Sequence, residues 1–250
     1  MSAVLQTRNL SKSFGGFVAS NNVSLSIQPG ARQALIGPNG AGKTTLINLL
    51  TGFLEPNSGE VFLMGANVTR LAQHQRVKRG LVRTFQINQL FAEMSVLESV
   101  TLSACERLGL GWRWWQPVER HLAALDAATE LLATLRLLDV AHEKVRSLPY
   151  GRQRLVEIAL ALASRPQVLL LDEPAAGVPA SESRELFESI ARLPKDVTIL
   201  LIEHDMDLVF RFAERISVMV GGALLAEDVP EVIARDRRVR EVYLGEILDG

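Results

Sequence analysis

One glycine-rich segment combines residue types that bind phosphate. It fits the spacing G-x-x-x-x-G-K-[ST]. Glycines let backbone N–H groups turn inward around phosphate oxygens, because no Cβ blocks their path. Lys43 has the reach to contact the outer phosphates, and the Thr44 hydroxyl is a suitable Mg²⁺ ligand. The residues predicted to cradle the phosphates are Gly37, Pro38, Asn39, Gly40, Ala41, Gly42, Lys43, Thr44 and Thr45.

The flanking sequence gives this segment the context that a phosphate-binding loop requires. Residues 33–36 are a short, mostly apolar strand, and residues 46–50 read as the start of a helix. The positive end of that helix adds to the attraction for an anion. The alternative is a glycine-rich turn without a role. The strand, loop and helix together favour a site for a nucleoside triphosphate.

A second strand ends in two carboxylates. The apolar run at 168–171 suits a buried parallel strand, and Asp172 and Glu173 follow it directly. Ligands in such sheets collect at the carboxyl ends of the strands. Because adjacent strand residues point to opposite sides, we expect different roles, with Asp172 in the Mg²⁺ shell and Glu173 on the attacking water. The alternative is an ordinary acidic turn.

A third apolar strand, at 198–202, leads to His204. A lone histidine after a strand is more often a structural hydrogen-bonding residue. At the end of a strand beside the other two, however, an imidazole N–H could donate to an oxygen of the γ-phosphate. We therefore expect His204 to belong to the nucleotide site.

The bulk properties limit the remaining possibilities. The chain has 250 residues, of which 48% are hydrophobic, and its net charge is −1, so no global field favours nucleic acid. The single Cys105 rules out an internal disulfide and fits a reducing compartment. We expect no signal peptide, because Ser11, Lys12 and Asn21 interrupt any apolar region near the N-terminus. We expect no membrane span, because no apolar run approaches the required length of roughly 20 residues.

The order of elements predicts an α/β fold with three parts. Strands are expected at 4–9, 23–27, 31–36, 60–64, 168–171, 197–202 and 216–220. From about residue 90 to 164 the apolar spacing is helical, with Leu122, Leu125, Leu132 and Leu135 on one predicted face. The prediction is a P-loop NTPase core with a mainly parallel sheet, an N-terminal antiparallel β part and an inserted α-helical subdomain.

With its phosphate loop, carboxylate strand and histidine in this order, the chain resembles the ATP-binding cassette (ABC) family. The resemblance runs over residues 4–246, and it implies core segments at 4–86 and 166–246 and a helical subdomain at 87–165. It implies that Phe14 stacks on adenine and that Gln86 is the Q-loop glutamine, which senses Mg²⁺ and the membrane partner. The signature segment of the family corresponds to Leu148, Pro149, Tyr150, Gly151, Arg152 and Gln153.

Three positions depart from the family pattern. The signature usually has serine where this chain has Pro149 and glutamine where it has Arg152. The D-loop, which corresponds to residues 176–179, usually has Asp or Asn where this chain has Pro179. Proline offers neither a hydroxyl nor an N–H to the γ-phosphate. Gly151 still opens the following helix, and Arg152 could supply charge instead. We therefore expect a functional dimer whose two ATP sites can differ, or alternatively a complete signature in the partner subunit only.

The resemblance also implies a mechanism and partners. Two ATPase subunits face each other head to tail, each ATP lies between one subunit's Lys43 and the other's Leu148, Tyr150 and Gly151, and hydrolysis reopens the dimer. Glu173, His204 and Gln86 are the implied catalytic residues; Thr44, Gln86 and Asp172 are the implied Mg²⁺ ligands. The implied partners are transmembrane permease subunits, a second ABC ATPase and, indirectly, a periplasmic solute-binding protein, with the chain peripheral on the cytoplasmic face of the inner membrane and no nucleic acid involved.

Local sequences around 150–151, 157–159, 173–177, 202–206 and 243–246 look like the ATPases of branched-chain amino-acid importers. Related systems import urea or amides or export lipopolysaccharide, and they remain alternatives. A soluble ABC ATPase acting on nucleic acid or ribosomes, or a regulatory subunit without turnover, are further alternatives. The absence of sustained heptads and the near-zero net charge count against the former.

Two other segments carry weaker signals. All three tryptophans, Trp112, Trp114 and Trp115, stand in one segment, which predicts either packing within the helical part or contact with a permease or lipid headgroups. The basic residues Arg70, Arg76, Lys78, Arg79 and Arg83 predict a solvated helix face.

Overall fold

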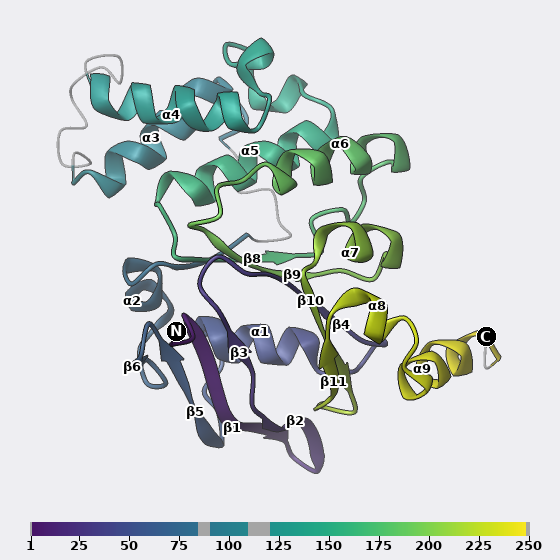
Figure 1. Ribbon diagram of the computed structural model, residues 1–250. Coiled ribbons are helices and arrows are strands. Elements are labelled where there is room, and N and C mark those ends of the chain that lie inside the picture. The colour runs from purple at the N-terminus through teal and green to yellow at the C-terminus, as the bar shows by residue number, and fades with distance from the viewer. Residues whose placement is uncertain (1, 85–90, 110–120, 249–250) are drawn as a thin grey trace. The chain divides into compact units, whose positions relative to one another are not determined.

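The computed structural model describes residues 2–84, 91–109 and 121–248 (Figure 1). The chain divides into two compact units. The first consists of Met1–Arg83, Gln167–Glu173 and Lys195–Gly250, and the second of Thr84–Pro166 and Pro174–Pro194. The predicted boundaries at residues 86, 87, 165 and 166 stay predictions. Within the described ranges, no helix combines the length and apolar character needed to cross a membrane.

The first unit contains an antiparallel sheet formed mainly by the N-terminal residues. Its strand order is β2-β1-β5-β6, and β3 pairs with β1. Side chains alternate between buried and exposed positions along parts of β1 and β5, which is typical of a sheet with one covered face. The strands are β1 (Leu5–Phe14), β2 (Phe17–Val23), β3 (Ser26–Ile27), β5 (Ser58–Leu63) and β6 (Ala66–Asn67).

The same unit contains a six-stranded sheet that is parallel except at one edge. Its order is β11-β10-β4-β9-β8-β7, and only β11 runs antiparallel to its neighbour. The central strands are buried throughout or nearly so, as expected for strands covered on both faces. The strands are β4 (Arg32–Ile36), β7 (Leu81–Arg83), β8 (Val168–Asp172), β9 (Thr198–Ile202), β10 (Arg215–Val220) and β11 (Ala223–Asp228).

Helix α1 (Lys43–Thr51) lies between the two sheets, as Figure 1 shows. Its side chains Leu46, Ile47, Leu49 and Leu50 are fully buried in a core shared by both sheets. Such burial stabilises the fold by roughly 1.5–3 kcal/mol for each large apolar side chain. The start of α1 is therefore held firmly at the end of β4.

The opposite face of the six-stranded sheet is covered by C-terminal helices. Val209 and Ile233 pack there against Ile36, Ile216 and Val218 of the sheet. The helices of the first unit outside the central core are α2 (Gln73–Lys78), α7 (Met206–Phe212), α8 (Pro230–Ile233) and α9 (Arg237–Leu248).

The second unit consists of helices. Helix α3 begins with a capping box, in which the Ser95 hydroxyl accepts from the Glu98 N–H and Glu98 accepts from the Ser95 N–H. The second unit comprises α3 (Val96–Arg107), α4 (Leu122–Thr134), the short 3₁₀ turns η3 (Leu138–Val140) and η4 (Val145–Ser147), α5 (Tyr150–Ala163) and α6 (Ala180–Ala191). The predicted fold class is confirmed.

Several local predictions were wrong. The expected strand at 23–27 is interrupted after Val23, and β3 is only Ser26–Ile27. The expected leucine face at 122–135 holds only in part, because Leu132 and Leu135 are buried but Leu122 is 67% exposed, and Ala124 and Ala128 are buried as well. Close helix packing favours these alanines, since a small side chain lets a neighbouring helix approach.

Four strands were not predicted, namely β2, β6, β7 and β11. Strand β7 has three residues, too few for a periodic signal. Strand β11 follows Gly221 and Gly222, both with positive φ, in a tight turn from β10. A Gly-Gly pair between apolar runs is a hairpin signal, so β11 was within reach of sequence analysis.

Candidate functional site

The predicted phosphate loop follows β4 and is shaped by close contacts with its own unit. A Cβ on Gly37 would stand 2.2 Å from the Met219 carbonyl oxygen, and a Cβ on Gly42 would stand 2.2 Å from that of Ala19. Gly42 also has a φ of +95° and precedes the first residue of α1. Only glycine fits these two positions, so the loop conformation is built into the sequence.

Lys43 folds over the loop that it follows. Its ammonium group donates to the carbonyl oxygens of Gly37, at 2.5 Å, and of Pro38, at 2.9 Å. Thr44 is exposed at the start of α1. A cation and a hydroxyl thus stand beside the N–H groups of a helix start, a combination that suits the phosphates of a nucleotide.

The strand order brings the three predicted motifs to one edge of the sheet. Strand β9 lies between β4 and β8, and all three run parallel, so the phosphate loop, the carboxylates and His204 follow neighbouring strand ends. Within this arrangement Ile202 pairs with Asp172 on one side and with Leu35 on the other. Ligands of open parallel sheets bind at this edge.

Asp172 is held by an arginine that the sequence analysis had placed elsewhere. Arg83 Nη2 lies 2.5 Å from Asp172 Oδ2, and Arg83 Nη1 donates to Asn48 Oδ1 at 2.8 Å. The Asp172 side chain is 9% exposed. The carboxylate is therefore paired, oriented and largely shielded from water.

Glu173 lies just past the end of β8. Its φ is +47°, in the left-handed region, and its N–H donates to the Ile202 carbonyl oxygen at 2.9 Å. The predicted strand alternation therefore does not orient Glu173, because the strand ends at Asp172. A non-glycine residue in this conformation costs on the order of 1 kcal/mol, and such strain clusters at functional sites.

The segment after β9 contains one buried and one exposed polar side chain. The Glu203 side chain is fully buried, whereas that of His204 is 71% exposed. The His204 N–H donates to Glu203 Oε2 at 3.2 Å. His204 is thus available to a ligand, while Glu203 supports the backbone beneath it.

Phe14 ends β1 in the antiparallel sheet. Its ring is 48% exposed, and Lys12 Nζ lies 5.4 Å from the ring centroid. An exposed ring with a neighbouring cation suits stacking against a flat, electron-rich base.

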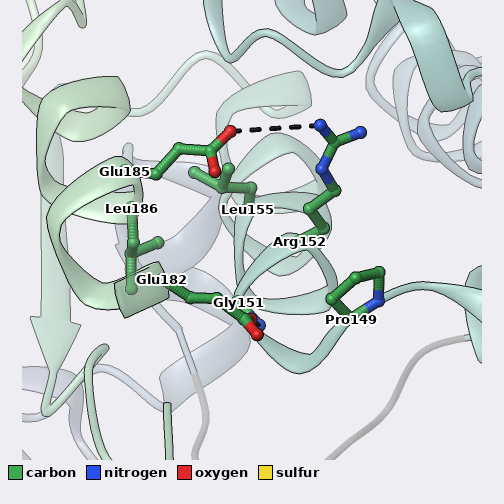
Figure 2. A pocket seen from close by; sticks show the side chains of 7 residues that line it. All are labelled: Pro149, Gly151, Arg152, Leu155, Glu182, Glu185 and Leu186. Carbon is green, nitrogen blue, oxygen red and sulfur yellow. Dashed lines mark hydrogen bonds and ion pairs between the residues drawn. The ribbon is translucent and has the colours of Figure 1, made fainter. Parts of the chain in front are cut away.

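The predicted signature and D-loop segments belong to the helical unit. Pro149 precedes α5 without a side-chain cap, and the Gly151 N–H donates to Glu182 Oε2 of α6 at 2.8 Å. A pocket of about 110 Å³ is lined by residues of these helices. Gly151 and Glu182 lie together at one end of it, as Figure 2 shows. Arg152 pairs with Asp139 at 2.5 Å and lies 4.0 Å from Glu185, so its charge is neutralised within the unit. This geometry does not support Arg152 as a substitute phosphate ligand.

Tyr150 connects the signature segment with the D-loop inside the same unit. A Cβ on Gly177 would lie 3.4 Å from the Tyr150 ring, and Arg154 Nη2 donates to the Tyr150 hydroxyl at 2.6 Å. Arg154 also pairs with Glu157, whose side chain is 10% exposed, at 2.7 Å. Burial raises the pKa of Glu157, and the hydrogen bond from Arg154 only partly offsets this.

One predicted site residue and the tryptophan segment singled out in the sequence lie outside the described residues. These are Gln86 and all three tryptophans, Trp112, Trp114 and Trp115. Nothing structural is stated for them.

Sequence reasoning did not identify three residues that hold predicted site residues in place, and it misjudged the burial of Arg76. Arg83 and Asn48 support Asp172, and Glu182 supports Gly151, but none stands in a recognisable motif. Arg76, predicted to be solvated, is 1% exposed. Arg70, Lys78 and Arg79 are exposed as predicted.

Comparison with known proteins agrees with this geometry. The pattern of the family described as ABC transporter matches residues 20–176. The chain belongs to the ABC transporter family. The chain is 42% identical to the high-affinity branched-chain amino acid transport ATP-binding protein LivG of Escherichia coli strain K12. The match covers 97% of this chain and 98% of that protein. The chain is 39% identical to the corresponding protein BraF of Pseudomonas aeruginosa, with the same coverage.

Solved ABC cassettes have the same fold. A cassette in its ADP conformation superposes with a TM-score of 0.85 and 33% identity, covering 98% of this chain and all of that one. A dimeric bacterial ABC transporter cassette gives a TM-score of 0.73 and 25% identity, covering 90% of this chain and 98% of that one. The resemblance inferred from the motifs is confirmed.

Proposed function

We propose that this ABC ATPase energises the import of branched-chain amino acids or related small polar solutes. The observation that carries the proposal is the 42% identity, across 97% of the chain, to a transport ATP-binding protein named for these amino acids. Similarity restricted to the phosphate loop would support only nucleotide binding. Here it extends through both compact units.

The proposed chemistry is hydrolysis of ATP at the edge formed by β4, β9 and β8. Glu173 takes a proton from water as the water oxygen attacks the γ-phosphorus, and ADP leaves with the electrons of the broken P–O bond. Lys43 and the loop N–H groups hold the phosphates, and His204 donates to a γ-phosphate oxygen. Phe14 stacks on the adenine, and Gln86 completes the site.

The donor set fits Mg²⁺. This ion prefers oxygen ligands and keeps several waters, so it needs only one or two protein groups besides the phosphates. An exposed Thr44 hydroxyl and the oriented Asp172 carboxylate meet that need, with Gln86 as the third proposed ligand. When bound, Mg²⁺ neutralises phosphate charge.

The proposed partners follow from transport. They are permease subunits, a second ABC ATPase subunit whose Leu148, Tyr150 and Gly151 complete each ATP site, and indirectly a periplasmic solute-binding protein. The dimeric cassette among the similar structures supports pairing of two subunits. The chain is then peripheral, on the cytoplasmic face of the inner membrane, and no nucleic acid takes part.

Two kinds of alternative to amino-acid import are tested by the same experiment. Urea or amide import and lipid export share the same ATPase chemistry and differ in the permease. A regulatory subunit without turnover is favoured by Pro149 and Pro179, which depart from the family pattern.

The test combines turnover with partner identification. Purified from native membranes, the chain should bring two permeases, a second ATPase and a solute-binding protein, and leucine should be taken up by vesicles reconstituted from that complex. Glu173→Gln should lower ATP hydrolysis by about 10²–10⁴-fold and leave ATP binding intact. Glu188→Gln, at an exposed position of α6, is the matched control. Normal turnover in Glu173→Gln, or partners that are only soluble, contradicts the proposal.

A further inference from the structure

Arg83 joins three elements of the first unit at the predicted metal carboxylate. It is the last residue of β7, and its side chain is 14% exposed. One guanidinium nitrogen contacts Asp172 at 2.5 Å, and another donates to Asn48 on α1 at 2.8 Å. The planar guanidinium can serve both partners at once because its donors are fixed in a fork.

The contact affects the charge that Asp172 can offer to a metal ion. A carboxylate that already pairs with a guanidinium has part of its negative charge neutralised, and one of its oxygens is engaged. Because both side chains are largely shielded from water, the mutual interaction is screened little. A second cation at Asp172 must therefore share the carboxylate with Arg83.

Three acidic residues follow one another at this edge of the sheet, and Arg83 is a cation in contact with one of them. Asp172, Glu173 and Glu203 stand at adjacent ends of β8 and β9, and the Glu203 side chain is fully buried. Carboxylates placed close together repel one another when the surroundings contain little water. Arg83 supplies a compensating charge that is part of the protein itself.

We propose that Arg83 is a positioning residue that competes with Mg²⁺ for Asp172. In the metal-free protein it holds the carboxylate in place, and on metal binding the carboxylate is shared or transferred. The inference rests on the proposed function, because Mg²⁺ is proposed to bind at Asp172 as part of ATP hydrolysis. It makes Arg83 a determinant of metal affinity that acts through Asp172.

The first measurement needs no metal. Arg83→Gln, Asp172→Asn and the double variant are unfolded with urea in the presence of EDTA. Each single substitution should lower the unfolding midpoint, and the double variant should lose less than the sum, because neither charge is then left alone. Additive losses would overturn the proposed coupling.

The second measurement is Mn²⁺ binding in the presence of a non-hydrolysable ATP analogue, monitored by electron paramagnetic resonance. Arg83→Gln should bind Mn²⁺ about tenfold more tightly than wild type, because the competing cation is gone. Asn48→Ala keeps the charge of Arg83 but removes the side chain that holds its guanidinium, so it should tighten Mn²⁺ binding about threefold. This variant tests the proposal if Arg83→Gln does not fold. The exposed Arg79→Gln should match wild type.

The outcomes separate the inference from the function on which it rests. Unchanged or weaker Mn²⁺ binding in Arg83→Gln, or in Asn48→Ala if only that variant folds, overturns the competition. A wild-type chain that binds no metal–nucleotide complex overturns the proposed function instead, while the metal-free unfolding series still measures the contact between Arg83 and Asp172.

Discussion

The backbone N–H of Gly151 donates to the carboxylate of Glu182, 2.8 Å away on the next helix. Helix α5 therefore receives its N-terminal anion from α6, since the residue that precedes it, Pro149, provides no side-chain cap. Glu182 itself stands in the first turn of α6, so the N-terminal dipoles of two helices favour its negative charge.

Replacing Glu182 should therefore destabilise the helical unit. Glu182→Ala leaves the Gly151 N–H without its acceptor and should lower the free energy of unfolding by about 1 kcal/mol. Glu182→Gln keeps an acceptor oxygen and should lose less. Urea denaturation of both variants measures this, and equal losses would show that the hydrogen bond contributes nothing.

The phosphate loop should not tolerate a side chain at Gly42. In Gly42→Ala the new Cβ would meet the Ala19 carbonyl at 2.2 Å in a left-handed backbone, which should cost about 3 kcal/mol and weaken ATP binding. Gly16→Ala is the matched control, because nothing lies within 4 Å of its Cβ. Thermal unfolding and nucleotide titration compare the two, and similar results for both would refute the steric argument.

Arg76 should be essential for stability although no carboxylate pairs with it in the described ranges. Its guanidinium donates to the carbonyl oxygens of Leu49 and Leu50 at the end of α1, and to those of Thr69 and Leu71. Burial lowers its pKa to about 10, so it stays protonated at neutral pH.

Arg76→Met removes these bonds and should lower the free energy of unfolding by about 3 kcal/mol. The exposed Arg79→Met should change it by less than about 0.5 kcal/mol. Chemical denaturation gives both values. An unchanged free energy of unfolding in Arg76→Met would mean that the carbonyl groups find other partners.

The partly buried Glu157 should make the stability of the protein depend on pH. Its pKa is raised in the folded state, chiefly by burial, so the folded protein binds this proton more tightly than the unfolded chain. Stability from this group is thus present below its ordinary pKa of 4.5 and is lost as the pH rises through the raised value.

Glu157→Gln removes the titrating group, so the variant should gain stability relative to wild type as the pH rises from about 4 to 7. Urea midpoints across this range test it. A constant difference between the two proteins would show that Arg154 compensates the burial of Glu157 fully.

Local sequence determined the chemistry of this protein. The phosphate loop, the strand ending in Asp172 and Glu173, and the strand before His204 are each continuous segments, so their residue types and spacing predicted them and the fold class. Their meeting at one sheet edge followed from the rule for parallel strands, and the strand order β4-β9-β8 bears it out.

Only the tertiary structure decided which charged side chains are buried and with which groups they pair. Arg76 and Arg83 stand in the same basic stretch as the exposed Arg79, yet one is buried against a helix end and the other holds Asp172. Glu182 likewise became the cap of a different helix. Spacing along the chain could not reveal this, because a charged side chain is buried only where segments distant in sequence supply its partners.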